Sequence, residues 1–134
     1  RGGVIGGSSA GASIQSEYMP RGHPLGNTVM MAEGYERGFC FLPGTAIDQH
    51  FFARKRTADM TRLMTTYPQL LGIGIDEGTA IVVKKSVAEV IGRGNVAFYD
   101  YRNRTGTNSH SDSPDYLSVS PGQRYDLKSR TLIK

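Results

Sequence analysis

A serine placed between glycines is the first feature of this sequence that could do chemistry. Gly7-Ser8-Ser9-Ala10-Gly11 fits the pattern G-x-S-x-G, in which a serine sits on a sharp turn between a strand and a helix. Glycine lacks a Cβ, so glycines on both sides permit the strained backbone of such a turn. Ser9 is therefore a candidate nucleophile, and the Ala10 N–H a candidate donor to an oxyanion. A phosphate-binding loop or a plain tight turn would also explain the pattern.

A nucleophilic serine needs a general base, and the base needs an acid that orients it. His50 follows one compact apolar run and precedes two phenylalanines. Glu77 follows another apolar run, and Gly78 after it allows the backbone to turn; its neighbour Asp76 is the alternative acid. Sites gather at the carboxyl ends of strands in open α/β sheets. The order of these strand ends predicts that Ser9, His50 and Glu77 meet as a catalytic triad.

A second assignment follows the order of the α/β-hydrolases, with Ser9, then Asp76 or Asp100, then His110. We rank it second, because an antiparallel tail between acid and histidine is not expected in that fold. His110 lies in a serine-rich loop, where an exposed polar residue is the simpler reading. His23 lies in a loop of glycines and prolines close to the serine turn.

The apolar runs predict the elements that would position these residues. Val4-Ile5 reads as a buried strand before the serine turn, and a helix from Ala10 to about Glu17 follows it. Three further elements are expected, namely a buried strand over 38–42, a helix over 53–66 and a buried strand over 70–75. The 53–66 helix has an inward apolar stripe at helical spacing, formed by Met60, Leu63, Met64 and Tyr67.

The last third of the chain is rich in short β-prone runs. They lie at 80–83, 87–91 and 96–99, and breaks at 92–95 and 121–122 read as hairpin turns. The predicted fold class is therefore α/β, a three-layer α/β/α arrangement with a mostly parallel sheet, a nucleophile elbow and an antiparallel C-terminal hairpin region.

The composition is that of an ordinary globular chain. Its 134 residues form one domain or part of one, with 38% hydrophobic and 21% charged residues and a formal net charge of +4. No apolar run is long enough to span a bilayer, and the scattered basic residues form no nucleic-acid-binding motif. The single cysteine, Cys40, excludes an internal disulfide, and its phenylalanine neighbours predict a buried thiol.

Two arginines follow the candidate histidine closely. At about 100° per residue, Arg56 lies roughly 40° from the apolar stripe of the predicted helix, on the side facing the body of the protein. A cation aimed inward beside His50 suggests an anionic ligand group, although a salt-bridged arginine at a helix end would look the same. Arg54 projects sideways.

Four ordered blocks resemble the cyanophycinase family, namely Gly6–Ala12, Gly44–Phe51, Arg54–Arg56 and Gly74–Ala80. That family consists of serine exopeptidases related to peptidase E, with a fold similar to the class I glutamine amidotransferases. The similarity runs from residue 2 to about residue 100. It implies hydrolysis of cyanophycin, multi-L-arginyl-poly-L-aspartate, to β-Asp-Arg dipeptides through an acyl-enzyme. A peptidase E-like aspartyl dipeptidase and a catalytically inactive binding homologue are the alternatives.

The resemblance also implies roles for individual residues. Ser9 would be the nucleophile, His50 the general base and then acid, and Glu77 its orienting partner. A second set would line the substrate groove, namely Asp48, Gln49, Arg54 and Arg56. Asp59 departs from the family pattern, because a further arginine is expected one turn past Arg56.

The remaining expectations concern the context of the chain. Residues 1–134 are expected to be the C-terminal portion of one cyanophycinase-like peptidase domain whose N-terminal half is missing. We expect no cofactor or metal, no nucleic-acid or membrane partner, and cyanophycin or a β-aspartyl peptide as substrate. A homodimer is expected from the resemblance only. The expected compartment is the cytoplasm, with a secreted form as the alternative.

Overall fold

The computed structural model describes residues 2–103 and 114–134. Helices in this part of the chain are α1 (Ala10–Ser13) and α2 (Thr57–Thr66). The strands are β1 (Ser16–Tyr18), β2 (Leu42–Gln49), β3 (Leu71–Ile75), β4 (Thr79–Lys84), β5 (Val87–Gly92), β6 (Val96–Asp100), β7 (Leu117–Val119), β8 (Arg124–Asp126) and β9 (Thr131–Ile133). The prediction of a mixed α/β chain is confirmed.

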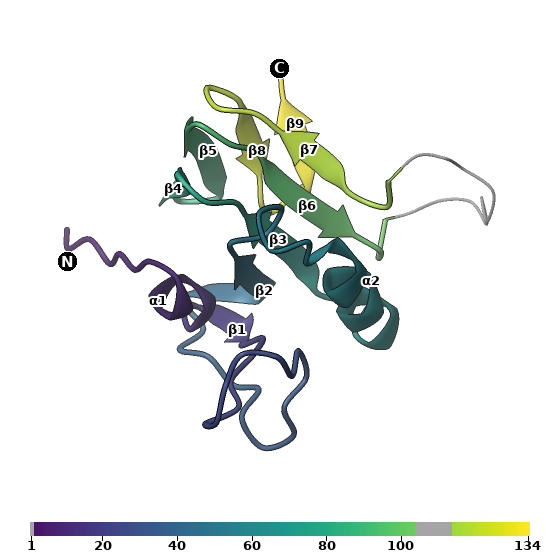
Figure 1. Cartoon of the computed structure of the whole chain (residues 1–134). Helices are drawn as coiled ribbons and strands as arrows, with labels where there is room; N and C mark the ends of the chain where they lie inside the picture. The colour runs from purple at the N-terminus through teal and green to yellow at the C-terminus, as the bar shows by residue number, and fades with distance from the viewer. Residues whose placement is uncertain (1, 104–113) are drawn as a thin grey trace.

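The strands form two sheets (Figure 1). The first has the order β1-β2-β3-β6-β7; its β1–β2 and β2–β3 pairs are parallel, and its β3–β6 and β6–β7 pairs are antiparallel. The second, with the order β4-β5-β8-β9, is antiparallel throughout. The prediction of a mostly parallel sheet is therefore wrong. Parallel neighbours need a long crossover, and in the described part of the chain residues 19–41 and the segment containing α2 form the crossovers of the two parallel pairs.

Helix α2 covers one face of the first sheet. The predicted stripe is confirmed at Met60, Leu63 and Met64, which are fully buried. Its fourth member, Tyr67, is partly buried and follows the last residue of the helix, which begins at Thr57 and not at the predicted residue 53. The residues of β3 that lie on this face are the glycines Gly72 and Gly74, and a Cβ at Gly74 would overlap the ring of Phe51. The pattern Leu-Gly-Ile-Gly-Ile thus lets Phe51 and the methionines of α2 approach the sheet closely.

The second sheet packs against the opposite face of the first. The large residues of β3, Leu71, Ile73 and Ile75, share this core with residues of β5, β6 and β8. The rings of Phe98 on β6 and Tyr125 on β8 stack across it with their centroids 3.9 Å apart. The layer opposite α2 is thus mainly a sheet, to which the short helix α1 adds Ala12. The prediction of helical layers on both faces is corrected accordingly.

Several predicted elements near the N-terminus differ from those observed. Residues 2–8 form no strand, and Val4 is 95% exposed. A strand needs a neighbouring backbone to pair with, and this segment has none in the described structure. Helix α1 ends at Ser13, before the predicted Glu17, because Ser16 begins the pairing of β1 with β2.

The predicted strand over 38–42 and the two predicted hairpins are also corrected. Strand β2 begins only at Leu42, and Cys40 has a φ of 59° and is exposed, so the prediction of a buried thiol is wrong. Residues 92–95 and 121–122 join strands of different sheets rather than hairpin partners. Tertiary pairing overrides the local turn signal there, because β6 and β7 pair within the first sheet.

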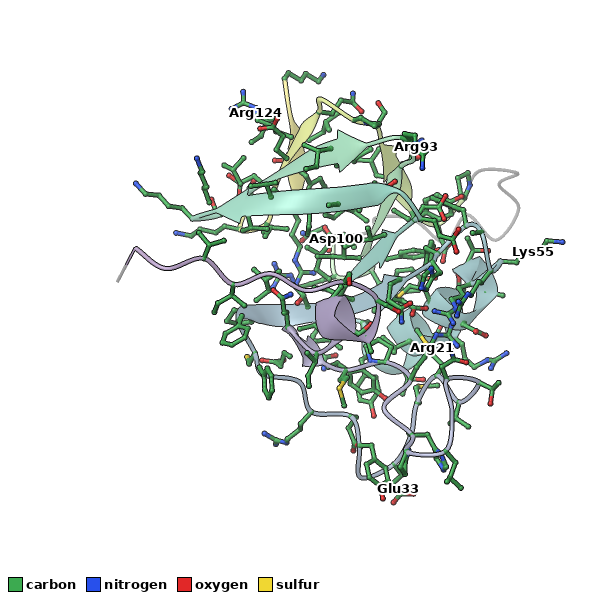
Figure 2. The ribbon with its side chains drawn as sticks, turned by 60° about the vertical axis from the view of Figure 1, so that its left-hand side comes forward. Arg21, Glu33, Lys55, Arg93, Asp100 and Arg124 are labelled. Atoms are coloured by element: carbon green, nitrogen blue, oxygen red, sulfur yellow. The ribbon has the colours of Figure 1, made fainter. Side chains whose placement is uncertain are left out.

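The charged side chains are distributed over the molecule. Figure 2 places Arg124, Arg93 and Lys55 at separate edges, whereas Arg21 lies close to the body. In the described ranges, no helix is both long and apolar enough to cross a bilayer.

Candidate active site

The backbone at Ser9 has the strain that the sequence pattern predicts. Ser9 precedes α1 with φ 54° and ψ −124°, a conformation that residues with a side chain rarely adopt. A Cβ at Gly7 would overlap the carbonyl oxygen of Gly11, so the turn requires glycine at position 7. A Cβ at Gly11 would meet open space, so the expectation of a steric need there is wrong.

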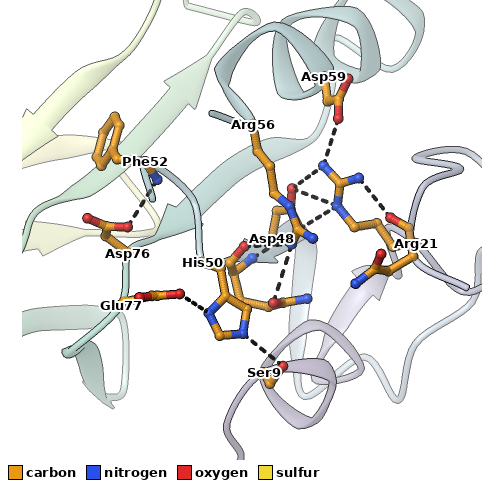
Figure 3. A network of polar contacts seen from close by, with 11 residues as sticks. Ser9, Arg21, Asp48, His50, Phe52, Arg56, Asp59, Asp76 and Glu77 are labelled. Atoms are coloured by element: carbon orange, nitrogen blue, oxygen red, sulfur yellow. Dashed lines mark hydrogen bonds and ion pairs between the residues drawn. The ribbon is translucent and has the colours of Figure 1, made fainter. Parts of the chain in front are cut away.

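The ends of three elements bring Ser9, His50 and Glu77 together (Figure 3). His50 directly follows β2, and its Nε2 lies 3.1 Å from the Ser9 Oγ. Its Nδ1 lies 2.9 Å from Oε1 of Glu77, which follows β3. When Nδ1–H donates to Glu77, Nε2 is free to accept the serine proton. The structure thus has the hydrogen-bond order of a serine, a base and an orienting acid.

The three residues line a groove of about 870 Å³. Its lining includes residues 3–9, residues 75–85, Leu42 and Ile47. Of the four predicted substrate-binding residues, Gln49 lines this groove. The substrate contacts of all four, Gln49 included, stay predictions. In the part of the chain that the structure describes, no group of three or more His, Cys, Asp or Glu side chains could hold a metal ion.

Asp48 lies in a buried ion-pair network behind His50 (Figure 3). Its fully buried carboxylate accepts hydrogen bonds from Arg21 Nε and Nη2 at 2.9–3.1 Å and from Arg56 Nη1 at 3.3 Å. Arg21 Nη2 also pairs with Asp59 at 2.8 Å. The residue that departs from the family pattern, Asp59, therefore has a structural partner. No local pattern in the sequence marks Arg21, because its partners lie 27 and 38 residues away.

Arg56 has the contacts of a salt-bridged arginine at a helix end. Its Nη1 donates to the Gln49 carbonyl oxygen at 2.7 Å as well as to Asp48. Burial lowers the pKa of Arg56. Burial also acts to lower the pKa of Arg21, but the hydrogen bonds to Asp48 and Asp59 outweigh it, and the pKa of Arg21 is raised. Both guanidiniums stay charged at neutral pH. The network therefore ties the end of β2, immediately before His50, to the start of α2.

Replacing Asp48 with alanine is expected to lower the free energy of unfolding by about 3–5 kcal/mol, because two buried guanidiniums lose the fully buried carboxylate that they share. Chemical denaturation of the full-length protein measures this loss. Asp59→Ala is the matched control and should cost at most about 1 kcal/mol, because the Asp59 side chain is 33% exposed and screened by water. Equal losses for the two variants would contradict the assignment of Asp48 as the centre of the network.

The sequence match extends over most of the chain. Residues 1–91 match the family described as peptidase family S51. The chain belongs to this family. Its S51 segment contains the serine turn, the residues that follow β2 and the carboxylates that follow β3, and thus all three members of the hydrogen-bonded set.

Three curated relatives of this S51 chain are named cyanophycinase. The protein of Geminocystis herdmanii (strain PCC 6308) is 37% identical over 107 residues, which cover 78% of this chain and 39% of the relative. That of Trichormus variabilis (strain ATCC 29413 / PCC 7937) is 33% identical over 145 residues, 97% of this chain and 47% of the relative. That of Synechococcus elongatus is 34% identical over 140 residues, which cover 93% of this chain and 42% of the relative. The chain spans less than half the length of each of these three relatives.

Of the competing set of catalytic residues, the structure of this S51 chain describes the two candidate acids. Asp76 accepts hydrogen bonds from the backbone N–H groups of Phe52 and Ala53. Asp100 pairs with Arg130 at 2.9 Å. His110, the histidine of that assignment, lies outside the described residues.

Proposed function

We propose that this chain carries the catalytic residues of a serine-type peptidase that hydrolyses cyanophycin to β-Asp-Arg dipeptides. The observation that carries the proposal is the continuous hydrogen-bonded series of Ser9 Oγ, His50 and Glu77 in a chain of peptidase family S51. The choice of cyanophycin is supported by the names of the curated relatives.

In the proposed acylation step, these atoms act in the order of their hydrogen bonds. Ser9 Oγ attacks the scissile carbonyl carbon while His50 Nε2, 3.1 Å away, takes the hydroxyl proton. The carboxylate of Glu77 stabilises the imidazolium that forms and fixes the orientation of the ring. As the first residue of α1, Ala10 has an N–H with no acceptor inside the helix, and we assign it to the developing oxyanion.

Deacylation reverses the proton transfers. The amine of the leaving segment departs with the proton held on His50 Nε2, which leaves an ester between Ser9 and the acyl part of the substrate. A water molecule then gives a proton to the same nitrogen and attacks the ester carbonyl. When the second tetrahedral intermediate collapses, the proton returns to Ser9 Oγ, and the free enzyme is restored.

The surroundings of the triad offer groups for a substrate that carries both carboxylates and guanidiniums. The Gln49 side chain lines the groove and has both a donor and an acceptor. Arg54 is exposed, and its backbone N–H donates to the His50 carbonyl oxygen at 2.9 Å, so its backbone lies one turn after the base. We assign substrate carboxylates to this arginine. A homodimer in the cytoplasm remains part of the proposal.

Incubation of the full-length protein with purified cyanophycin tests the function. The expected result is release of β-Asp-Arg by the unaltered protein and none above background by Ser9→Ala. Hydrolysis of Asp-X dipeptides without attack on the polymer would identify a peptidase E-like dipeptidase instead. Release that survives in Ser9→Ala, or no peptidase activity on either substrate, would overturn the proposal.

A further inference from the structure

His50 makes two ring contacts in the candidate site and has an unfavourable backbone conformation. Its ring must reach Ser9 and Glu77 at once, and both contacts lie within hydrogen-bonding distance. Its φ of 49° is in the left-handed region, which residues with a Cβ adopt only when the surrounding structure holds them there. The residues on either side of His50 must therefore be fixed by other groups.

On the N-terminal side, the fixing group is the buried network already described. The Gln49 N–H donates to Asp48 Oδ1 at 3.0 Å, and the Gln49 carbonyl oxygen accepts from Arg56 at 2.7 Å. Both backbone polar groups of Gln49, the residue before His50, are thus held by charged, buried side chains. Such charge-assisted hydrogen bonds are shorter and stronger than neutral ones.

On the C-terminal side, the fixing group is Asp76. Its Oδ1 accepts hydrogen bonds from the N–H groups of Phe52 at 3.1 Å and Ala53 at 2.9 Å, while the Phe51 N–H donates to the Ile75 carbonyl oxygen at 3.1 Å. Three successive N–H groups after His50 are therefore bound by the end of β3.

Asp76 and Glu77 share this strand end but serve different partners. Figure 3 shows the Asp76 carboxylate beside the Phe52 backbone and the Glu77 carboxylate beside the His50 ring. The two carboxylates reach these partners from adjacent positions directly after β3, so one strand end can hold the backbone after His50 and its ring together. We propose that Asp76 is a positioning residue, which acts on the reaction through the conformation of His50 and not as the triad acid.

The proposal rests on the proposed peptidase function, and three variants of the full-length protein test it. Asp76→Ala removes the acceptor and is expected to lower kcat about 10- to 100-fold, because a misplacement near 1 Å at a reacting group has an effect of that size. KM should change less than about threefold, since Asp76 is not assigned to the substrate. Asp76→Asn keeps an oxygen acceptor and should retain at least about a third of the kcat. Glu77→Gln is the matched variant of the adjacent carboxylate.

The pH profile separates positioning from acid chemistry. Asp76→Asn should keep the pH–rate profile of the unaltered protein, whereas Glu77→Gln, which changes the direct partner of the ring, should alter both rate and profile. The proposal is overturned if Asp76→Asn is as inactive as Glu77→Gln, or if Asp76→Ala keeps full kcat. If Asp76→Ala does not fold, Asp76→Ser takes its place, since it is polar but too short to reach both N–H groups. An inactive unaltered protein would contradict the peptidase function itself.

Discussion

Replacing His50 with asparagine is expected to lower kcat by about 10⁴- to 10⁶-fold, the range seen when the base of a serine triad is removed. Without an imidazole, no group in the described site lies within hydrogen-bonding distance of Ser9 Oγ to accept its proton. Asparagine is the suitable replacement because it tolerates the left-handed backbone that His50 adopts. The loss then reports chemistry rather than a distorted turn. Initial rates of β-Asp-Arg release, with thermal unfolding measured in parallel, give both quantities.

His23→Asn is the matched control for this variant. The Nδ1 of His23 accepts a hydrogen bond from the Leu25 N–H in the loop between β1 and β2, and its ring packs near Tyr35. The control should keep a kcat within about twofold of the unaltered value, as for a substitution away from the reacting groups. A His50→Asn variant that hydrolyses the polymer at more than about one hundredth of the normal rate would contradict the triad.

Glu77→Gln is expected to lower kcat by about 10²- to 10⁴-fold. The glutamine has the same shape, but it carries no charge to stabilise the imidazolium, and its amide group can bind the wrong tautomer of the ring. The side chain of Glu77 is 55% exposed, so the folded state should lose little stability. Steady-state kinetics should show the loss in kcat, with KM nearly unchanged.

A carboxylate that does not contact the histidine ring gives the control for Glu77→Gln. Asp59→Asn alters a carboxylate that is bound to Arg21, not to the histidine ring. We expect it to keep at least about half of the normal kcat, since weakening a partly exposed ion pair has a small effect. If Glu77→Gln behaved like this control, a different group would have to orient His50.

The parts of the fold that follow from local patterns were predictable. The stripe Met60, Leu63 and Met64 defines which side of α2 is buried, because helical periodicity fixes side-chain direction. The positions of His50 and Glu77 at strand ends followed from apolar runs that end in polar residues, although β2 extends to Gln49, seven residues beyond the predicted end. The triad could therefore be proposed without any knowledge of the sheet order.

Features that depend on distant partners were not predictable. Arg21 binds Asp48 and Asp59 across long sequence separations, and its own neighbours carry no periodic signal. The antiparallel pairing of β6 with β3 joins strands that are not adjacent in sequence, so the turn at 92–95 looked like a hairpin. The exposed Val4 shows the same limit, since an apolar strand pattern does not supply the neighbour that a strand requires.

Reaction with a fluorophosphonate probe, followed by peptide mass spectrometry of the full-length protein, shows whether Ser9 is an activated nucleophile. Such a probe forms a covalent adduct with a serine whose hydroxyl is activated by a neighbouring base. We expect one adduct, on the peptide containing Ser9, whose formation is abolished in Ser9→Ala and strongly slowed in His50→Asn. An adduct on another residue, or no adduct in a protein that cleaves cyanophycin, would contradict this expectation.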